Sequence, residues 1–382
     1  PGYVASIYNI MAFFLSKFHF QTGTAIFDYH DNNKVELNKT ITCLNVNWAI
    51  TDSDFTQDNK IMIHSTLSPY IQLFDVENKK YIHQIDVSCE TQQLPDYHGF
   101  WYGGMRVFTA KIAADGKEVI AGTSRIAGGS AKLQIYDLTQ NKISRSIDAH
   151  DNDINSICFV DKLNSSLIIS GSDDVLCKLW DTRAFNGNRP VGAFYGHMGG
   201  ITNVCSKEDN RYFISNCKDQ SIKLWDLRKS TTEKKSVSTV LFGVDYRRAV
   251  LDDMIIDRIK ERMKLNKDDN SVSTFFGHQV RGTLIRCHFS PKFVTDQRFI
   301  YSGSADGCVY IYDILSGKHV AKLEISQGQI IRDCAWHPFS QNIITTDFEG
   351  NVCRWEYFDL EDDEKGLKGA TRLCNALTDL DL

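Results

Sequence analysis

The feature that most constrains this chain is a short motif that recurs along most of its length. An apolar residue, an aromatic residue and an acid follow one another six times, and a looser seventh copy has arginine in the apolar place. The copies are Ile26-Phe27-Asp28, Leu73-Phe74-Asp75, Ile135-Tyr136-Asp137, Leu179-Trp180-Asp181, Leu224-Trp225-Asp226, Ile311-Tyr312-Asp313 and Arg354-Trp355-Glu356. Their aromatic residues are separated by 47, 62, 44, 45, 87 and 43 residues. A nearly constant interval indicates a repeat architecture whose units bury one shared core.

Intervals of about 40 to 45 residues are typical of WD-type β-propellers, in which each blade is a four-stranded antiparallel sheet. We therefore expect an all-β, seven-bladed WD-repeat β-propeller over residues 1–358, with a truncated first blade. The expected blades span residues 4–40, 41–88, 105–150, 151–197, 198–278, 279–326 and 327–358. An acidic tail at 359–382 follows, with a short helical stretch at 364–376. No strand is evident to complete the last blade, so ring closure is the weakest part of this architecture.

The interval of 87 residues is one blade plus an insertion at residues 229–270. Within it, residues 252–263 have the pattern of a charged helix, with Ile255, Ile259 and Met263 on one stripe. The insertion interrupts the connection between the third and fourth strands of blade five. We expect it either to support the face that carries this connection or to be a solvated appendage.

Histidine, serine and aspartate recur at similar offsets around the aromatic residue of copies four to six. In copies four and five they can form a buried chain with the indole N–H, which avoids the cost of about 1–3 kcal/mol for an unpaired buried donor. Copy six has Tyr312 in place of tryptophan. The set recurs once per blade, so it indicates a structural network and not a catalytic triad. Its members are His150, Ser170, Asp174, His197, Ser215, Asp219, His278, Ser302 and Asp306.

Composition and motifs argue against several classes of function. The net charge is −5, with 43 basic and 48 acidic residues, so we expect no nucleic-acid partner. The apolar run at residues 8–15 is too short for a membrane helix, and we expect no membrane partner. No phosphate-binding loop, hydrolase elbow or zinc-ligand spacing is evident, so we expect no enzyme, no metal and no cofactor. The eleven cysteines are interpreted as reduced, buried residues of an intracellular protein, with a redox-sensing thiol as the alternative.

Two copies extend to Trp-Asp-x-Arg, which places Arg183 and Arg228 just beyond the third strand of their blades. This pattern resembles the signature box of substrate receptors of cullin-4 ubiquitin ligases, in which the arginine helps to dock the propeller on a triple-propeller adaptor. The alternative for a single copy is an arginine that fixes its own loop. The resemblance gives these adaptor-binding candidates: Trp180, Asp181, Arg183, Trp225, Asp226 and Arg228.

Residues 105–358 resemble the WD-repeat protein 23 type of receptor, within the DDB1- and CUL4-associated factor family. The likeness is carried by residues 190–193 before Gly196-His197, by 200–228, 245–247 and 283–291, and by 332–339. It implies a non-catalytic receptor that recruits proteins for ubiquitination and proteasomal degradation in nucleus and cytoplasm. Such receptors often also hold the adaptor with a helical segment ahead of the propeller, which this sequence does not show, so we expect weaker adaptor binding.

WD-repeat proteins commonly bind peptides around the central channel, on the face opposite the connections between the third and fourth strands. Arginines there would suit an acidic peptide of a protein substrate through bidentate contacts. The candidates are Arg106, Arg125, Lys218, Gln279, Arg281, Gln329, Arg332 and Trp101. The alternative for Arg106 and Arg332 is that they are strand residues that pair with neighbouring acids and do not bind a peptide. The alternative function is a general interaction scaffold, for example in RNA processing or chromatin assembly, without a ligase role.

Overall fold

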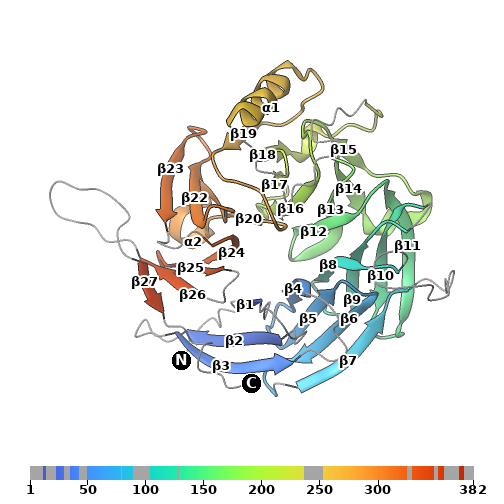
Figure 1. Ribbon diagram of the computed structural model, residues 1–382. Helices are drawn as coiled ribbons and strands as arrows, with labels where there is room; N and C mark the ends of the chain where they lie inside the picture. The colour runs from blue at the N-terminus through green and yellow to red at the C-terminus, as the bar shows by residue number, and fades with distance from the viewer. Residues whose placement is uncertain are drawn as a thin grey trace, which may run out of the picture.

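Six antiparallel sheets of four strands are arranged around a common axis in the computed structural model of the protein (Figure 1). The structure describes residues 12–13, 23–29, 35–42, 50–78, 80–88, 104–126, 129–235, 253–324, 329–347, 352–356 and 370–373. Within each of these sheets, strands that are consecutive in the chain are paired. The chain is therefore an all-β propeller, and we number its blades two to seven after the repeat copies that form them.

Each blade begins with its innermost strand. Blades two and three consist of β4 (Ile50–Phe55), β5 (Ile61–Thr66), β6 (Tyr70–Asp75), β7 (Lys80–Asp86), β8 (Val107–Ile112), β9 (Glu118–Thr123), β10 (Ala131–Asp137) and β11 (Lys142–His150). Blades four and five consist of β12 (Ile154–Asp161), β13 (Asn164–Ser172), β14 (Cys177–Asp181), β15 (Gly192–Phe194), β16 (Ile201–Ser206), β17 (Tyr212–Cys217), β18 (Ser221–Asp226) and β19 (Ser273–Phe276). Blades six and seven consist of β20 (Cys287–Phe289), β21 (Phe299–Ser302), β22 (Cys308–Asp313), β23 (His319–Glu324), β24 (Ile331–Trp336), β25 (Ile343–Asp347), β26 (Val352–Trp355) and β27 (Ala370–Leu373).

The first repeat copy differs from the others. Its strands β1 (Ala12–Phe13), β2 (Gly23–Tyr29) and β3 (Val35–Thr42) form a three-stranded sheet, which Figure 1 shows between blades seven and two. The prediction of seven blades is therefore wrong in number, since the described residues form six four-stranded blades. The physical reason is that copy one supplies only three paired strands here, one of them two residues long.

The last blade is completed by the C-terminal segment. β27 pairs with β26 in antiparallel register, with Ala370 opposite Trp355 and Leu373 opposite Val352. The expectations of a helix at residues 364–376 and of a missing fourth strand are wrong at this point. An open edge of β26 would present unpaired backbone N–H and C=O groups, and β27 supplies partners for them that a local helix cannot supply.

The apolar core lies between neighbouring blades. Between blades four and five, for example, Phe194, Phe213 and Trp225 are almost completely buried, with the ring centroids of Phe194 and Phe213 4.8 Å apart. The recurring aromatic residue of the motif is thus a core residue, as Trp180 also shows by its burial between blades three and four. Each blade therefore needs its neighbours to bury its own faces.

Charged side chains bridge blades six and seven to blade two around the channel. The Arg332 guanidinium donates to the Thr51 carbonyl oxygen at 2.6 Å. The Arg286 guanidinium donates to the same carbonyl at 3.1 Å and to the Asp52 carboxylate at 2.7 Å. Asp52 is only 3% exposed, so its charge depends on these partners. One buried charge pair and two hydrogen bonds to a backbone carbonyl thus link blades six and seven to blade two.

Candidate functional site

A buried polar chain links blade four to the last strand of blade three. The His150 ring contacts the Asp174 carboxylate through Nδ1 at 2.7 Å and the Ser170 hydroxyl through Nε2 at 2.6 Å. The indole N–H of Trp180 donates to the same hydroxyl at 2.8 Å. Burial lowers the pKa of His150, so the ring is neutral near pH 7, and the contact with this ring helps hold the pKa of Asp174 at about 2. The chain ties together three strands and the turn between two of them.

Blade five repeats the same contacts. His197 contacts Asp219 at 2.9 Å and Ser215 at 2.7 Å, and the Trp225 indole donates to Ser215 at 2.7 Å. Ser221 also donates to the Asp219 carboxylate, at 2.6 Å. Every polar group in the set therefore has a partner, which a buried network requires.

Blade six does not form the chain that its sequence suggests. His278 contacts the Tyr312 hydroxyl at 3.1 Å and, through its other ring nitrogen, the Asn216 amide oxygen of blade five at 2.8 Å. Ser302 instead donates to the carbonyl oxygens of Arg286 and Gly303, and Asp306 accepts from the Tyr310 hydroxyl. The Tyr312 hydroxyl thus alters the network in blade six: it contacts His278 directly, and Ser302 and Asp306 have other partners.

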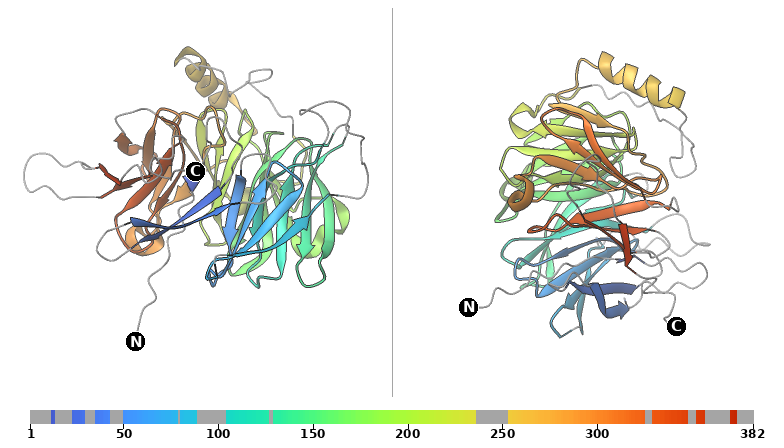
Figure 2. Two further views of the ribbon diagram at one scale, coloured as in Figure 1. Left: turned by 60° about the horizontal axis from the view of Figure 1, so that its bottom comes forward. Right: turned by 90° about the vertical axis from the view of Figure 1, so that its left-hand side faces the viewer.

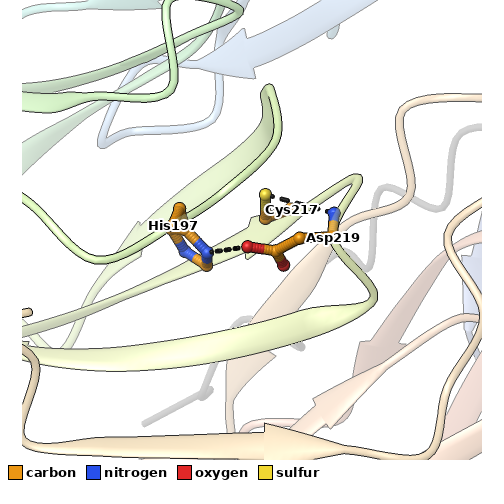
Figure 3. A group of neighbouring side chains, drawn as sticks. All are labelled: His197, Cys217 and Asp219. Atoms are coloured by element: carbon orange, nitrogen blue, oxygen red, sulfur yellow. Dashed lines mark hydrogen bonds and ion pairs between the residues drawn. The ribbon is translucent and has the colours of Figure 1, made fainter. Parts of the chain in front are cut away.

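His197, Cys217 and Asp219 come close enough in blade five to suggest a metal site (Figure 3). Their donor atoms are engaged in hydrogen bonds, however. The Cys217 thiol donates to the Gly199 carbonyl oxygen at 3.0 Å, and burial raises its pKa well above the usual value, so it is not a thiolate. Both ring nitrogens of His197 have side-chain partners. We assign the group to the structural network.

Burial also bears on the redox alternative for the cysteines. It raises the pKa of Cys158, Cys287 and Cys334 well above the usual value. A protonated thiol is a poor nucleophile, so these three residues behave as small apolar side chains.

Arg183 is held by the aspartate of its own motif and still faces solvent. Its Nε and Nη2 atoms donate to the two oxygens of Asp181 at 2.9 and 2.7 Å. The same carboxylate caps the short 3-10 helix Thr182–Gly187 by accepting from the Arg183 backbone N–H. The Arg183 side chain is 73% exposed. The bidentate pair fixes one edge of the guanidinium and leaves its other N–H donors to solvent.

Arg228 in blade five has the same arrangement. Its Nε and Nη2 atoms donate to the oxygens of Asp226 at 3.1 and 2.8 Å, and its side chain is 66% exposed although Asp226 is only 5% exposed. Hydrogen bonds from Arg228 hold the pKa of Asp226 well below its usual range. The two arginines are thus both loop-fixing and accessible, whereas Trp180 and Trp225 beside them are buried.

Both arginines lie at the same end of the blades. In an antiparallel blade the connection from first to second strand and the connection from third to fourth strand are at one end, and the remaining turns are at the other. Arg183 and Arg228 follow the third strands β14 and β18. We call this end of the propeller the arginine face.

The inserted helix α1 (Asp253–Leu265) lies away from the arginine face. Its Ile259 and Met263 pack with Met198 and Phe276, and Phe276 pairs with Ser221 at the far end of β18 from Asp226. Both views of Figure 2 show α1 and the short helix α2 (Lys292–Thr295) on opposite sides of the ring. The expectation that the insertion supports the arginine face is therefore wrong for α1, because the apolar stripe of this helix is buried against the other end of the blade.

The predicted peptide-binding residues have varied surroundings. Lys218 pairs with Asp173 at 2.6 Å, and Arg332 reaches across to Thr51. Arg125 is exposed and donates from Nε to the Gly129 carbonyl oxygen. Arg106, Arg281 and Gln329 are half-buried, Gln279 is exposed, and Trp101 lies outside the described residues. Lys218 and Arg332 thus bind other residues of the propeller. The structure gives no contacts that join the described candidates into one cluster.

The channel holds a charged group that the sequence reading missed. A cavity of about 470 Å³ is lined by inner strands of blades two to six, including Asp52, Lys111 and His288. Lys111 pairs with Asp52 at 3.0 Å, and His288 contacts Asp333 at 2.7 Å. Asp333 raises the pKa of His288 to about 9. No local motif marks these residues, since they come from different repeats.

Comparison with known proteins identifies the repeat. The family model described as "WD domain, G-beta repeat" matches residues 141–181, 188–226 and 269–313. None of the helices in the described part of the chain is both long and apolar enough to cross a bilayer.

Several known proteins are similar to this chain over most of its length. The chain is 35% identical over 363 residues to a LEC14B homolog of Prunus armeniaca, which covers 94% of this chain and 72% of that protein. It is 38% identical over 319 residues to the LEC14B protein of Lithospermum erythrorhizon, covering 82% and 64%. It is 32% identical over 320 residues to a DDB1- and CUL4-associated factor 11 homolog of Caenorhabditis elegans, covering 81% and 52%. The chain thus spans only part of each relative.

Proposed function

The chain belongs to the WD-repeat family that includes LEC14B and the DDB1- and CUL4-associated factor 11 homologues, and we propose that it is a substrate receptor of a cullin-4 ubiquitin ligase. In this role it docks on the ligase adaptor through its two Trp-Asp-x-Arg boxes. It recruits a protein for ubiquitination and proteasomal degradation, in the nucleus and cytoplasm, and performs no catalysis itself.

The observation that supports this proposal most directly is the state of Arg183 and Arg228. Each guanidinium is fixed by a carboxylate that is itself mostly buried, and each remains about two-thirds or more exposed. Fixing a long side chain before binding saves about 0.5–1.5 kcal/mol of ordering cost at an interface. An arginine needed only to fix its own loop would gain nothing from this exposure.

Adaptor binding tests the proposal. We expect the Arg183→Glu/Arg228→Glu variant to bind a purified triple-propeller adaptor at least about tenfold more weakly than the wild type, because two cations at one interface become anions. A second variant, Arg183→Gln/Arg228→Gln, avoids placing a new anion beside Asp181 and Asp226. Biolayer interferometry measures both affinities.

A matched control is available on the inserted helix. Arg258 and Arg262 are exposed on α1, away from the arginine face, so Arg258→Glu/Arg262→Glu makes the same charge change elsewhere. This control should bind the adaptor as the wild type does. Unchanged binding by the Arg183/Arg228 variants would favour the general scaffold alternative instead.

The substrate is proposed to bind at the opposite face as an acidic peptide. Arg125 and Arg281 are the better candidates there, because Lys218 and Arg332 already have internal partners. A fluorescent Asp/Glu-rich model peptide should lose affinity by about fivefold or more on Arg125→Glu/Arg281→Glu substitution. The Arg183→Glu/Arg228→Glu variant serves as its control, since that change lies on the other face.

A further inference from the structure

Asp226 in blade five binds a second arginine that is not part of the Trp-Asp-x-Arg box. The Nε atom of Arg211 donates to Asp226 Oδ2 at 3.2 Å, while Arg228 uses both oxygens. Arg211 comes from the connection between the first and second strands, and its side chain is 45% exposed. One buried carboxylate therefore holds two guanidinium groups on the arginine face, with a net charge of +1.

Blade six has a carboxylate at the equivalent position, but the arginine that binds it comes from another connection. Leu315 stands where Arg228 stands in blade five, two residues after the motif aspartate, and it is 86% exposed. Asp313 instead accepts from Nε of Arg298 at 2.8 Å and from its Nη2 at 2.6 Å. The Arg298 side chain is 58% exposed and Asp313 only 4%. Blade six thus presents a fixed guanidinium without a Trp-Asp-x-Arg box.

Arg211 and Arg298 occupy equivalent positions in the two blades. The carbonyl oxygen of Arg211 accepts from the Leu227 backbone N–H at 2.8 Å, and that of Arg298 accepts from the Ile314 N–H at 3.1 Å. Each arginine directly precedes the second strand, whose first residue pairs with the motif aspartate. The equivalence places Arg298 on the arginine face, next along the ring from Arg228.

Two exposed phenylalanines adjoin this row. Phe293 lies on α2, in the same connection as Arg298, and Phe339 lies in the corresponding connection of blade seven. Their side chains are 78% and 59% exposed, and their ring centroids are 5.3 Å apart. Leaving two large rings in water together is unfavourable, and such patches commonly mark protein interaction sites. Aromatic residues and arginine are also the residue types enriched at binding hot spots.

We propose that the adaptor-docking surface extends from Arg183 and Arg228 across blades six and seven, through Arg211 and Arg298 to the Phe293–Phe339 pair. The partner surface that fits it carries carboxylates opposite the guanidinium row and an apolar patch opposite the two rings. This inference rests on the proposed function, because the arginine face is taken as the face that meets the adaptor. The row of guanidinium groups and the aromatic pair lie at one end of four consecutive blades.

Two variants test the extension against the purified adaptor by biolayer interferometry. Phe293→Ser/Phe339→Ser should weaken binding about tenfold with little dependence on salt, since it removes apolar contact. Arg298→Glu should weaken binding about fivefold at low salt and less at high salt, since it removes a charge contact. Arg298→Gln, which keeps a neutral side chain beside Asp313, is the second variant if Arg298→Glu does not fold.

The matched controls lie on α1. Leu265 is 78% exposed, so Leu265→Ser removes a similarly exposed apolar side chain away from the arginine face, and Arg258→Glu matches the charge change. Both should bind as the wild type does. If Arg183→Glu/Arg228→Glu loses adaptor binding while the Phe293/Phe339 and Arg298 variants keep it, the extension is overturned and the proposed function stands. If every variant, including the Arg183/Arg228 pair, binds as the wild type, both ideas fail.

Discussion

Blades five and six follow the same strand plan and use their polar side chains differently. In blade five, Trp225 donates to Ser215, which His197 also contacts. In blade six, Tyr312 contacts His278 directly, and that histidine turns to Asn216 of blade five. Burial lowers the pKa of His278 to about 4, so the ring stays neutral in this arrangement. Where blade five has a tryptophan and a His–Ser–Asp chain, blade six has a tyrosine and a histidine that contacts the neighbouring blade.

The comparison shows that both blades must satisfy the same buried polar groups, but that different residues can do so. A buried donor needs an acceptor, and a carboxylate at the end of the third strand takes a guanidinium from whichever connection supplies one. The inner strands diverge further. Cys205 of blade five corresponds to His288 of blade six, whose charge faces the channel. His288 thus links blade six to Asp333 of blade seven.

The largest difference between the blades should come from their turn aspartates. Asp219 is fully buried and accepts from Ser221, the Met198 N–H and His197, so Asp219→Ala leaves several buried donors unpaired. We expect it to lower the free energy of unfolding by about 3–5 kcal/mol, and Asp306→Ala by about 1 kcal/mol, because Asp306 is partly exposed. Urea titration measures both values. Equal losses would mean that the two networks contribute equally to the free energy of unfolding.

The aromatic residues should differ by less. Trp225→Phe removes both an indole N–H and the volume of one ring from a completely buried site, and we expect a loss of about 2–3 kcal/mol. Tyr312→Phe removes only a hydroxyl and should cost about 1–2 kcal/mol. A Tyr312→Phe variant less stable than Trp225→Phe would show that the contact between blades is the stronger of the two.

The channel histidine should make stability depend on pH. Asp333 raises the pKa of His288 from 6.5 to about 9 in the folded protein, so its stabilising effect is complete below pH 6.5 and is lost as the pH rises toward 9. We expect the wild type to lose about 1–2 kcal/mol over this window, after allowance for partial exposure of the ring. His288→Gln should flatten that part of the curve. Urea titrations at several pH values measure the slope, and an unaltered slope in His288→Gln would contradict the assignment.

The smallest stability effects should come from exchanging the surface residues after the motif aspartates. Arg228→Leu and Leu315→Arg each alter an exposed side chain, so the free energy of unfolding should change by less than about 1 kcal/mol. Their effects on adaptor binding should have opposite signs, with Leu315→Arg about twofold tighter because it adds a second guanidinium near Asp313. Differential scanning fluorimetry and interferometry separate the two readouts. Binding changes of the same sign would argue against charge as the cause.

The strand pattern and the buried network of blades four and five follow from local sequence. The repeated motif gives the period, the turn residues give the strand ends, and the recurring His, Ser and Asp positions meet because each set lies within a short stretch of sequence. The positions of Arg183 and Arg228 just beyond a third strand are also readable locally, since the Trp-Asp-x-Arg box is contiguous. Short-range geometry is fixed by the backbone spacing of the strands.

Other features depend on residues that the fold brings together from distant parts of the chain. Only the tertiary structure shows that β27 completes blade seven, that copy one forms three strands, and that Arg286 and Arg332 join blade two. It also decides that Asp313 holds Arg298 and that Phe293 meets Phe339. Each of these contacts pairs groups from different strands or different blades. A local pattern cannot encode them, because the partner is chosen by how the sheets close into a ring.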